Sequence, residues 1–487
     1  MIDISIVFAA VGTMLLVGAF SNKLSSRFNV PILLIFLLFG MFVGQNHSPG
    51  DLEFSAISVA GTIAMCFILF SGGLDTKFSS IKPVLLPGGV LATIGVILTC
   101  LFFAVCARGI FYKELSFAGC LLLGAMISST DAAAVFGILS GKSVGLKGRL
   151  RPVLELESGS NDPMAYFLTL FMIEIVLGKN AFGITAVLLL LYRMAGGVVL
   201  GILVGMFGKL LYKTKLDYEG LYFVFDIAIV LLAYGLTEGI SANGMMACYV
   251  CGITMNHRGF NYQKGITRFS DGVSWLMQVL LFTTLGIFVD VSSLPSISFK
   301  GLLLAAILLF VARPAAVFIS LTGQSFSWRE KLLISWVGLR GAAPIVLATF
   351  PLAYGVGSAK LYFNLIFFMV LVSMLIQGMT LMPLAKLLKL DKTFSGRERM
   401  PLELESTPAT SGQEMKEFIV PEDAFYAGKT IAELSLPRGV LITLIRRGKS
   451  LLPPNGQTVI HEGDGLLIMG SHENLARVQS TFFPLSD

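Results

Sequence analysis

Long apolar segments separated by short polar loops constrain this chain more than any other feature of its sequence. They recur throughout residues 1–390, and many reach the roughly 17 to 25 residues that an α-helix needs to cross a bilayer. Of the 487 residues, 55% are hydrophobic and only 14% are charged. Soluble domains carry about a quarter charged residues. We therefore expect an all-α membrane protein with many spans.

The apolar segments predict about thirteen membrane-spanning helices. Their approximate ranges are 4–21, 30–45, 55–73, 84–107, 115–139, 153–177, 183–211, 219–238, 241–256, 270–290, 301–322, 331–353 and 361–387. The first segment lacks a basic stretch before it and a cleavage motif after it, so we expect a retained span.

Basic residues alternate across the predicted loops. Every second loop is rich in them: Lys23 and Arg27; Lys77 and Lys82; Lys142, Lys147, Arg149 and Arg151; Lys209, Lys213 and Lys215; Arg258, Lys264 and Arg268; Arg329 and Lys331. The other loops hold only Arg108, Lys113, Lys179, Lys300 and Lys360. Basic residues favour cytoplasmic loops. The pattern predicts an outside N-terminus and a cytoplasmic C-terminus, and it implies no nucleic-acid partner.

The composition changes after Lys392. Residues 391–414 are polar and read as a linker. Residues 415–487 contain the strand-like runs EFIV, GVLITLIRR, TVI and GLLIMG, and the helix-like runs KTIAELSL and ENLARVQSTF. We expect a small cytoplasmic α/β domain. It shows no nucleophile–base set and no metal cluster, so regulation is expected and not catalysis.

The fifth predicted span is interrupted by Ser128, Ser129, Thr130 and Asp131. These residue types compete with helical hydrogen bonding and favour helix caps. We expect a broken helix with Asp131 at the start of its second half, where a carboxylate offsets the positive end of the helix dipole. The alternative is an ordinary N-cap at a span boundary, but apolar residues flank the polar run on both sides.

The sixth predicted span carries Glu157 and Asn161 on one helical face and Ser158 and Asp162 on a neighbouring one. Pro163 follows at once and should leave a backbone carbonyl without its helical partner. The alternative, a loop ending at the proline, fails on length. Polar and charged residues within a membrane span are expensive and mark functional sites by default.

Two arginines lie within later spans, Arg313 in the eleventh and Arg340 in the twelfth. A buried guanidinium needs a carboxylate or a helix C-terminus beside it. Gly341 and Pro344 indicate a second interrupted helix. The interrupted spans are seven apart, so they run in opposite directions. Spans 1–6 and 8–13 are therefore expected to form inverted repeats, as in many secondary transporters.

The intramembrane charges predict what the site exchanges. Asp131, Glu157 and Asp162 outnumber Arg313 and Arg340 by one negative charge. A proton or a monovalent cation would neutralise that charge. A desolvated carboxylic acid holds its proton more tightly than one in water, so one site could carry H⁺ and a cation alternately.

Four segments resemble the NhaP-type branch of the bacterial cation/proton antiporters. In chain order they are SSTDAAAVF, ESGSNDP, RPAAV and GLRGAAPI. The resemblance covers about residues 1–390. It implies a homodimer in the bacterial inner membrane, surrounded by lipid, that moves a six-helix core in an elevator-like manner. It also implies exchange of K⁺ or Na⁺ for H⁺.

The resemblance assigns roles to the central residues. Asp162 would be the carboxylate shared by the proton and by K⁺ or Na⁺. Ser158 and the backbone of Thr130 would help to coordinate the ion, and Asn161 would support the site. Asp131 would balance the crossed half-helices. An Asn before the Asp resembles the electroneutral branch of the family.

Further assignments concern the surrounding charges. Glu157 would pair with Arg313, and Arg340 would balance the other half-helix ends. The third span departs from the family pattern, because Ser71 stands where many relatives have an acidic residue, with Asp75 one turn later. Both are candidate accessory residues, and the family's ion selectivity is not carried over to this chain.

Residues 415–484 resemble the C-terminal half of domains that regulate K⁺ conductance. The stretch GKTIAELSLPRGVLITLIRRGKSLLPPNGQTVIHEGDGLLIMG carries this resemblance. The resemblance implies that such a domain dimerises and binds ions or nucleotides, including cyclic dinucleotides. Because these domains are coupled to K⁺ systems, the resemblance favours K⁺, with or without Na⁺, as the exchanged ion. Arg446, Arg447 and Lys449 form either a patch for an anionic ligand or a solvated hairpin edge.

Other readings remain open. A cation channel gated by the same domain is the main alternative, although no carbonyl-ring filter such as TVGYG is present. An intramembrane hydrolase would need Ser158 or Ser160 as nucleophile, and no intramembrane histidine could serve as its base. Asp226 and Arg193 either line an aqueous funnel or pair structurally. No cofactor is expected, because the one CxxC pair, Cys248 and Cys251, lies inside a predicted span and the four histidines are scattered.

Overall fold

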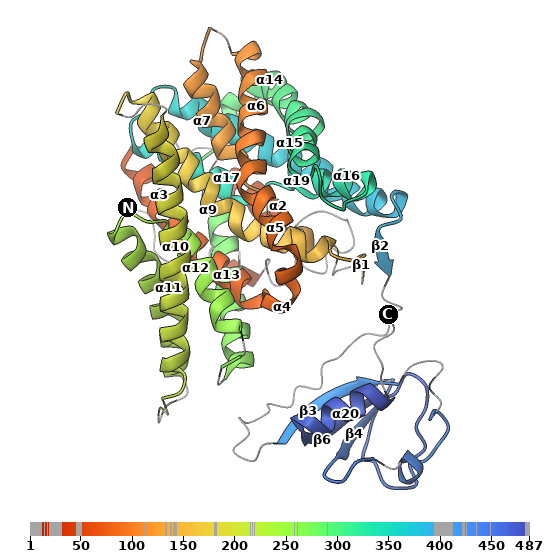
Figure 1. Ribbon diagram of the computed structural model, residues 1–487. Helices are drawn as coiled ribbons and strands as arrows, with labels where there is room; N and C mark the ends of the chain where they lie inside the picture. The colour runs from red at the N-terminus through yellow and green to blue at the C-terminus, as the bar shows by residue number, and fades with distance from the viewer. Residues whose placement is uncertain are drawn as a thin grey trace. The chain divides into compact units, whose positions relative to one another are not determined.

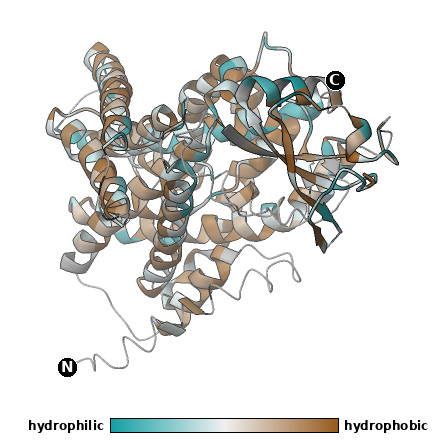
Figure 2. Cartoon of the chain, turned by 90° about the horizontal axis from the view of Figure 1, so that it is seen from below, coloured by the Kyte–Doolittle hydropathy of each residue, from teal (hydrophilic) through white to brown (hydrophobic). Residues whose placement is uncertain are grey.

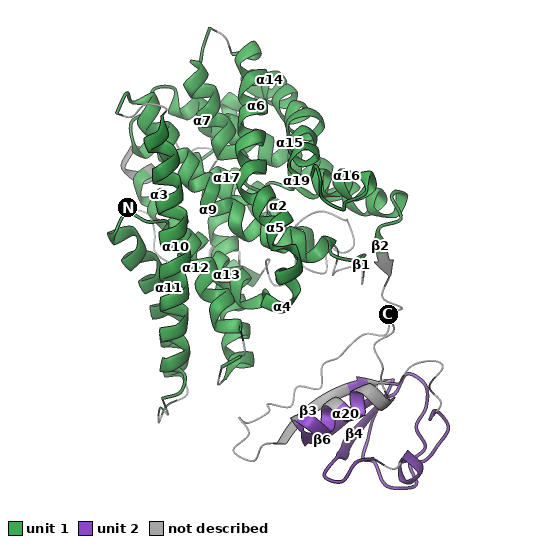
Figure 3. Ribbon diagram, in the orientation of Figure 1, with its two compact units in different colours: residues 1–396 green, residues 397–487 purple. Residues whose placement is uncertain are grey.

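The computed structural model describes residues 32–44, 51–111, 113–131, 144–179, 183–214, 220–257, 262–289, 291–393, 413–420, 426–434, 436–448 and 450–482, with short pieces between these ranges. The chain divides into two compact units, Met1–Gly396 and Arg397–Asp487 (Figure 3). The boundary falls within the predicted linker. Most of the first predicted span, 4–21, and most of the linker lie outside the described residues.

The first unit is helical (Figure 1). Its helices are α2 (Ile32–Val43), α3 (Asp51–Asp75), α4 (Phe78–Ile81), η1 (Lys82–Val84), α5 (Leu85–Val90), η2 (Leu91–Gly95), α6 (Val96–Ile110), α7 (Phe117–Ile127), α9 (Leu150–Val176), α10 (Ile184–Leu211), α11 (Leu221–Gly239), α12 (Gly244–Asn256), α13 (Gln263–Ile287), η3 (Val291–Ser293), α14 (Leu294–Ile307), η4 (Leu308–Ala312), α15 (Arg313–Ser320), α16 (Trp328–Val337), α17 (Ala342–Leu347), α18 (Phe350–Ala353) and α19 (Ala359–Leu387).

Each predicted span from 30–45 onward coincides with at least one of these helices. Within the described part of the chain, six continuous helical runs are long and apolar enough to cross a membrane, or seven with a bent pair counted as one span. The total of thirteen stays a prediction. Hydrophobic residues predominate along the helices (Figure 2), and several large apolar residues are exposed, such as Ile184, which is 73% exposed. Lipid is the solvent that such faces require.

Close helix contacts in this unit use glycine. A Cβ on Gly73 of α3 would lie 2.3 Å from the carbonyl oxygen of Tyr249, and one on Gly252 of α12 would lie 2.4 Å from that of Phe70. No side chain fits at either distance, so α3 and α12 approach through their backbones. Such small-residue interfaces replace hydrophobic burial between helices in a membrane.

Two helices are interrupted near each other. α7 ends at Ile127 and is followed by non-helical residues 128–131, while α16 and α17 are separated by residues 338–341 and bent by 51°. The backbone N–H of Asp131 donates to the carbonyl of Leu339 at 2.7 Å, so the two breaks meet. Interruptions at both places were expected from the polar and glycine–proline pattern. The inverted-repeat relation stays a prediction.

The predicted linker begins later than residue 391. Strand β2 (Asp391–Thr393) pairs antiparallel with β1 (Val144–Leu146), which lies directly before α9. The assignment of 391–393 to a linker is therefore wrong. A polar strand of three residues gives no hydrophobic alternation by which it could be recognised.

The second unit contains a four-stranded antiparallel sheet. Its strands are β3 (Gln413–Ile419), β4 (Leu441–Arg447), β5 (Ser450–Leu452) and β6 (Gly465–Ser471), in the order β3-β6-β4-β5. The helix α20 (His472–Phe482) and the 3₁₀ turn η5 (Ile431–Leu434) complete it. Buried side chains of the strands and of α20, including Ile445, Ile468 and Val478, form its core.

Two local predictions for this unit are wrong. KTIAELSL forms only the turn η5, because Gly428 with φ +87° precedes it and Pro437 follows it closely. TVI joins no sheet, and its Val459 forms only an isolated bridge with Thr430. The short strand β5 was not predicted.

Candidate functional site

A cavity of about 550 Å³ lies within the first unit. Four carboxylates line it, those of Asp75, Asp131, Glu155 and Asp162. Arg151 and Ser158 line it as well. The cavity is thus acidic overall, and it brings α3, the interrupted fifth span and α9 together around polar atoms.

Helix α9 presents the polar residues of the sixth predicted span. It continues through Pro163 from Leu150 to Val176, so the alternative of a loop ending at that proline is wrong. The side-chain amide of Asn243 on α12 donates to the Pro163 carbonyl at 2.8 Å. Glu157 and Asn161 are buried, whereas Ser158 and Asp162 are half-buried and line the cavity.

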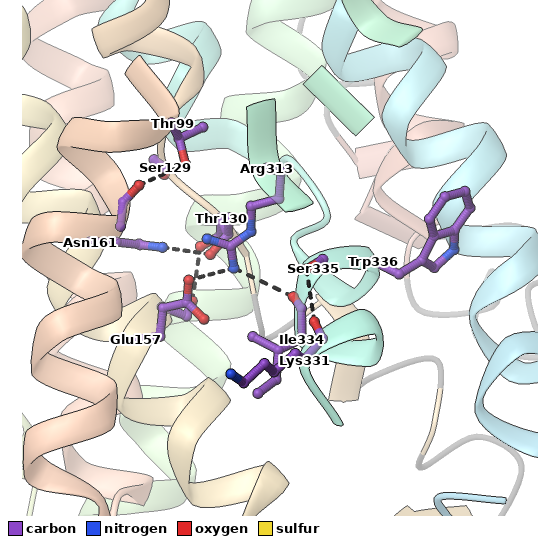
Figure 4. A network of polar contacts seen from close by, with 12 residues as sticks. Thr99, Ser129, Thr130, Glu157, Asn161, Arg313, Lys331, Ile334, Ser335 and Trp336 are labelled. Atoms are coloured by element: carbon purple, nitrogen blue, oxygen red, sulfur yellow. Dashed lines mark hydrogen bonds and ion pairs between the residues drawn. The ribbon is translucent and has the colours of Figure 1, made fainter. Parts of the chain in front are cut away.

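The side chains of α9 contact the break after α7. The hydroxyl of Ser129 donates to the Asp162 carboxylate. The hydroxyl of Ser158 donates to the backbone carbonyl of Thr130 at 3.0 Å, and the amide of Asn161 donates to the Thr130 hydroxyl at 2.5 Å (Figure 4). Carboxylate, hydroxyl and carbonyl oxygens therefore converge where the helix is unwound.

Glu157 and Arg313 form a buried ion pair. The guanidinium Nη2 lies 2.5 Å from the Glu157 carboxylate, and the two side chains are 1% and 2% exposed. The same nitrogen lies 3.5 Å from the carbonyl of Ile334 (Figure 4). A buried charge is tolerated when it has a close partner of opposite sign, and this pair fixes α9 to α15.

Arg340 is satisfied differently. Its side chain is fully buried and donates to the carbonyls of Ile127 and Ser129, at the C-terminal end of α7. A helix C-terminus carries partial negative charge, which stabilises a cation there. Its backbone N–H donates to the hydroxyl of Ser373 at 3.1 Å.

Asp131 lies at the start of the second half of the interrupted span. Its carboxylate accepts from the backbone N–H of Ala134 at 3.0 Å, as an N-cap does. It also lies against the N-terminus of α17, where a Cβ on Gly341 would be 2.1 Å from its Oδ2. Two positive helix ends thus face one carboxylate.

The accessory residues on α3 separate. Asp75 lines the cavity, but Ser71 does not, and its hydroxyl donates to the carboxylate of Asp271 on α13 at 2.8 Å. The sequence analysis did not name Ser129, Glu155 or Asp271 as site residues. Ser129 belongs to the recognised polar run, but its direction depends on non-helical backbone, and Asp271 lies 200 residues from its partner.

Asp226 and Arg193 do not contact each other. Asp226 on α11 is buried and accepts from the hydroxyl of Ser270 at 2.6 Å, while the guanidinium of Arg193 lies 5.6 Å from the centre of the Phe167 ring. Neither lines the cavity around Asp162. These contacts favour structural partners within the protein, Ser270 for Asp226 and Phe167 for Arg193, and the aqueous-funnel alternative stays a prediction.

In the second unit, Arg447 is engaged within the domain. Its guanidinium donates to the Asp464 carboxylate at 3.0 and 2.8 Å and to the carbonyl of Val459 at 2.7 Å. The hydrogen bonds to Asp464 raise the pKa of Arg447. Lys449 lies outside the described residues. Of the suggested anionic-ligand patch, Arg447 is thus already neutralised by an internal partner.

Two family descriptions match this chain. Residues 11–387 match the transmembrane sodium/hydrogen exchanger family, and residues 415–482 match the TrkA-C domain. Similar proteins include a K(+)/H(+) antiporter NhaP2 of Shewanella sp. strain ANA-3, 36% identical over 98% of this chain and 83% of the relative. A K(+)/H(+) antiporter NhaP of Alkalimonas amylolytica is 34% identical over 92% of this chain and 78% of its own length.

The fold has a solved counterpart. The sodium proton antiporter MjNhaP1 from Methanocaldococcus jannaschii superposes with a TM-score of 0.66 at 23% identity, over 77% of this chain and 100% of that one. This likeness concerns the helical membrane fold alone.

Proposed function

Because this chain belongs to the sodium/hydrogen exchanger family, and is thus a transporter and not an enzyme, we propose that it exchanges K⁺ or Na⁺ for H⁺ across the bacterial inner membrane. The exchange is one cation for one proton. The N-terminus lies outside and the C-terminus in the cytoplasm, following the loop charges.

One observation carries this proposal: a half-buried carboxylate, Asp162, lines a polar cavity beside an unwound helix. Ser158 and the Thr130 carbonyl lie next to it, joined by a hydrogen bond of 3.0 Å. Backbone carbonyls at broken helices and oxygen-bearing side chains replace the hydration shell of Na⁺ and K⁺. Asp162 therefore supplies the charge and its neighbours supply neutral oxygens.

The charges around Asp162 support one-for-one exchange. Glu157 is paired with Arg313, Arg340 occupies the C-terminal end of α7, and Asp131 caps a helix. Asp162 is then the carboxylate that either proton or cation can neutralise. Loading with H⁺ or with M⁺ gives the same total charge, so the cycle is electroneutral.

The site is built to move as one body. Hydrogen bonds of Ser129 and Thr130 join the first break to Asp162 and Asn161 of α9. The Asp131–Leu339 hydrogen bond joins the two breaks. We infer that α9 and the interrupted helices shift together against α10–α12 in an elevator-like cycle. The protein functions as a homodimer in this scheme.

The decisive experiment compares two carboxylates of the first unit. Asp162→Asn should abolish cation-dependent proton flux in proteoliposomes, while Asp226→Asn, outside the cavity, should retain it. Persistent exchange in Asp162→Asn would disprove the assignment. Current without proton coupling in the wild type would favour a gated channel.

The preferred ion and its control belong to the same proposal. Relatives named K(+)/H(+) antiporters and the TrkA-C domain at residues 415–482 support K⁺, with or without Na⁺. The second unit acts as a regulatory domain that binds an anionic ligand such as a nucleotide or cyclic dinucleotide. Flux with K⁺, Na⁺ and Li⁺ across pH, with and without added nucleotide, tests both points.

A further inference from the structure

A second, larger cavity lies on a different face of α9. It measures about 1360 Å³ and is bordered by Leu156 and Ser160 of that helix. Tyr249 of α12 lines both cavities. Most of the second cavity is walled by apolar side chains of α10, α12 and the helical run from Phe78 to Thr93. We call it the apolar groove.

One face of α10 forms a wall of the groove. The residues on it recur at helical spacing, Ala195, Val198, Ile202, Met206 and Lys209, and Lys213 continues the spacing two residues after the helix ends. The first four are uncharged and the last two are lysines, so the wall is apolar along its length and cationic at one end. Across the groove, Leu85, Gly89 and Thr93 also recur every fourth residue.

Aromatic residues line the groove at the end where the lysines lie. Phe78 and His257 pack edge to face, with ring centres 5.2 Å apart. Lys209 donates to the backbone carbonyl of His257, which holds its ammonium at this end. Lys213 lies just beyond the end of α10 and also lines the groove. Two ammonium groups and an imidazole thus surround the mouth of an otherwise apolar channel.

We propose that the groove binds one anionic phospholipid, with an acyl chain along α10 and its phosphate at Lys209 and Lys213. From Ala195 to Lys209 the helix rises about 21 Å, which is half of a bilayer of roughly 40–45 Å. A single lipid of one leaflet has this reach. Lys209 lies in the last turn of α10 and Lys213 just after it, at the end of the helix that the charge pattern predicts to be cytoplasmic, where anionic lipids attract basic residues.

A second copy of the chain fits the groove less well. The exposed apolar face of α10 continues beyond the groove through Leu188 and Leu191, which lie on the same side of the helix as Met206 and Lys209. A purely apolar face would suit a partner helix, whereas the groove has two lysines at one end, which suit a phosphate. The lipid touches α9 on one side and α10 on the other. Its occupancy therefore affects movement between these helices, which goes beyond the exchange reaction itself.

Photolabelling of the full chain tests binding without any transport measurement. The protein is reconstituted in phosphatidylcholine vesicles containing phosphatidylglycerol with a photoactivatable acyl chain, and labelled peptides are identified by mass spectrometry. Labels are expected on peptides covering 195–206 and 85–93. The double variant Lys209→Gln with Lys213→Gln should lower this labelling on the order of tenfold. Lys386→Gln, a lysine at the end of α19, should not.

A second pair of variants tests the groove itself. A Cβ on Gly89 or on Gly109 meets no atom within 4 Å, but Gly89 lines the groove and Gly109 does not. Gly89→Phe should abolish the label and Gly109→Phe should preserve it. Excess unlabelled phosphatidylglycerol should compete with the label in the wild type. Equal labelling by a phosphatidylcholine probe, or cross-links between two copies through residues 195–206, would overturn the proposal.

Discussion

Two buried arginines show how single residues set the charge of this core. Arg313 pairs with the carboxylate of Glu157, and Arg340 with the carbonyl oxygens at the end of α7. Their sequence context indicated that each needs such a partner. The carbonyl oxygens around Arg340 are uncharged, so this group of atoms keeps the positive charge of the guanidinium, whereas the Glu157–Arg313 pair is neutral. Replacing one member of the pair leaves the other as an unpaired buried charge and therefore lowers the free energy of unfolding.

Glu157→Gln should destabilise the first unit strongly. The substitution leaves Arg313 buried without an opposite charge, which costs about 3–5 kcal/mol. Thermal unfolding of the purified protein measures the loss, and Arg313→Met in the same chain should recover much of it. Glu114→Gln is the control, because its pair with Lys300 is exposed and worth about 0–1 kcal/mol. Equal losses in both variants would contradict the assigned role of the buried pair.

Gly341→Ala should displace Asp131. The added Cβ would lie 2.1 Å from the carboxylate, and such overpacking costs about 1–3 kcal/mol. We expect lower stability and reduced proton–cation exchange in proteoliposomes. Gly235→Ala on α11 has open space at its Cβ and serves as control. Wild-type exchange in Gly341→Ala would show that the close approach is dispensable.

At the scale of elements, the interrupted helices were predictable one by one, but their meeting was not. Ser128–Asp131 and Gly341–Pro344 mark each break by residue type alone. The hydrogen bond from Asp131 to Leu339 joins positions 208 apart, since 339 minus 131 is 208. No local period encodes such a contact, so only the family resemblance anticipated the crossing. The three-residue strands β2 and β5 were missed for the related reason that they are too short to show alternation.

Strand β4 of the second unit depends on one ion pair. Asp464→Asn should weaken the bonds from Arg447 and lower local stability by about 1–3 kcal/mol, the range for hydrogen bonds to a charged group. Hydrogen exchange of the full chain should rise in β4 and β6. Glu473→Gln, in an exposed pair with Arg477, should change little. Unchanged exchange in Asp464→Asn would mean that the sheet holds without this pair.

At the scale of the whole molecule, the sequence and the structure agree on a helical membrane unit followed by a small α/β unit. Hydropathy is an averaged property, so it survives errors at individual residues. Boundaries depend on a few residues, and the predicted end of the first unit at residue 390 was too early because β2 follows it. The first predicted span lies outside the described residues, so its prediction stands untested.

The position of β2 sharpens the design of a truncation. Ending the chain after Thr393 keeps β2, whereas ending it after Leu390 removes the strand and exposes β1. If the second unit regulates transport, the chain that ends after Thr393 should exchange cations without the normal pH or ligand response. The chain that ends after Leu390 should in addition lose stability or flux. Equal flux and pH response in the full chain and in the chain that ends after Thr393 would disprove the regulatory role.

The pairing of β1 with β2 also has a mechanical consequence. Leu146 of β1 lies four residues before the start of α9, and Thr393 of β2 is the last residue before the undescribed stretch. A pull on the chain at residue 394 would therefore reach the segment that leads into α9 through the paired strands β1 and β2, as well as α19, which ends at Leu387. If α9 carries the exchanged ion, as proposed, a force on the C-terminal segment would act at the start of that helix.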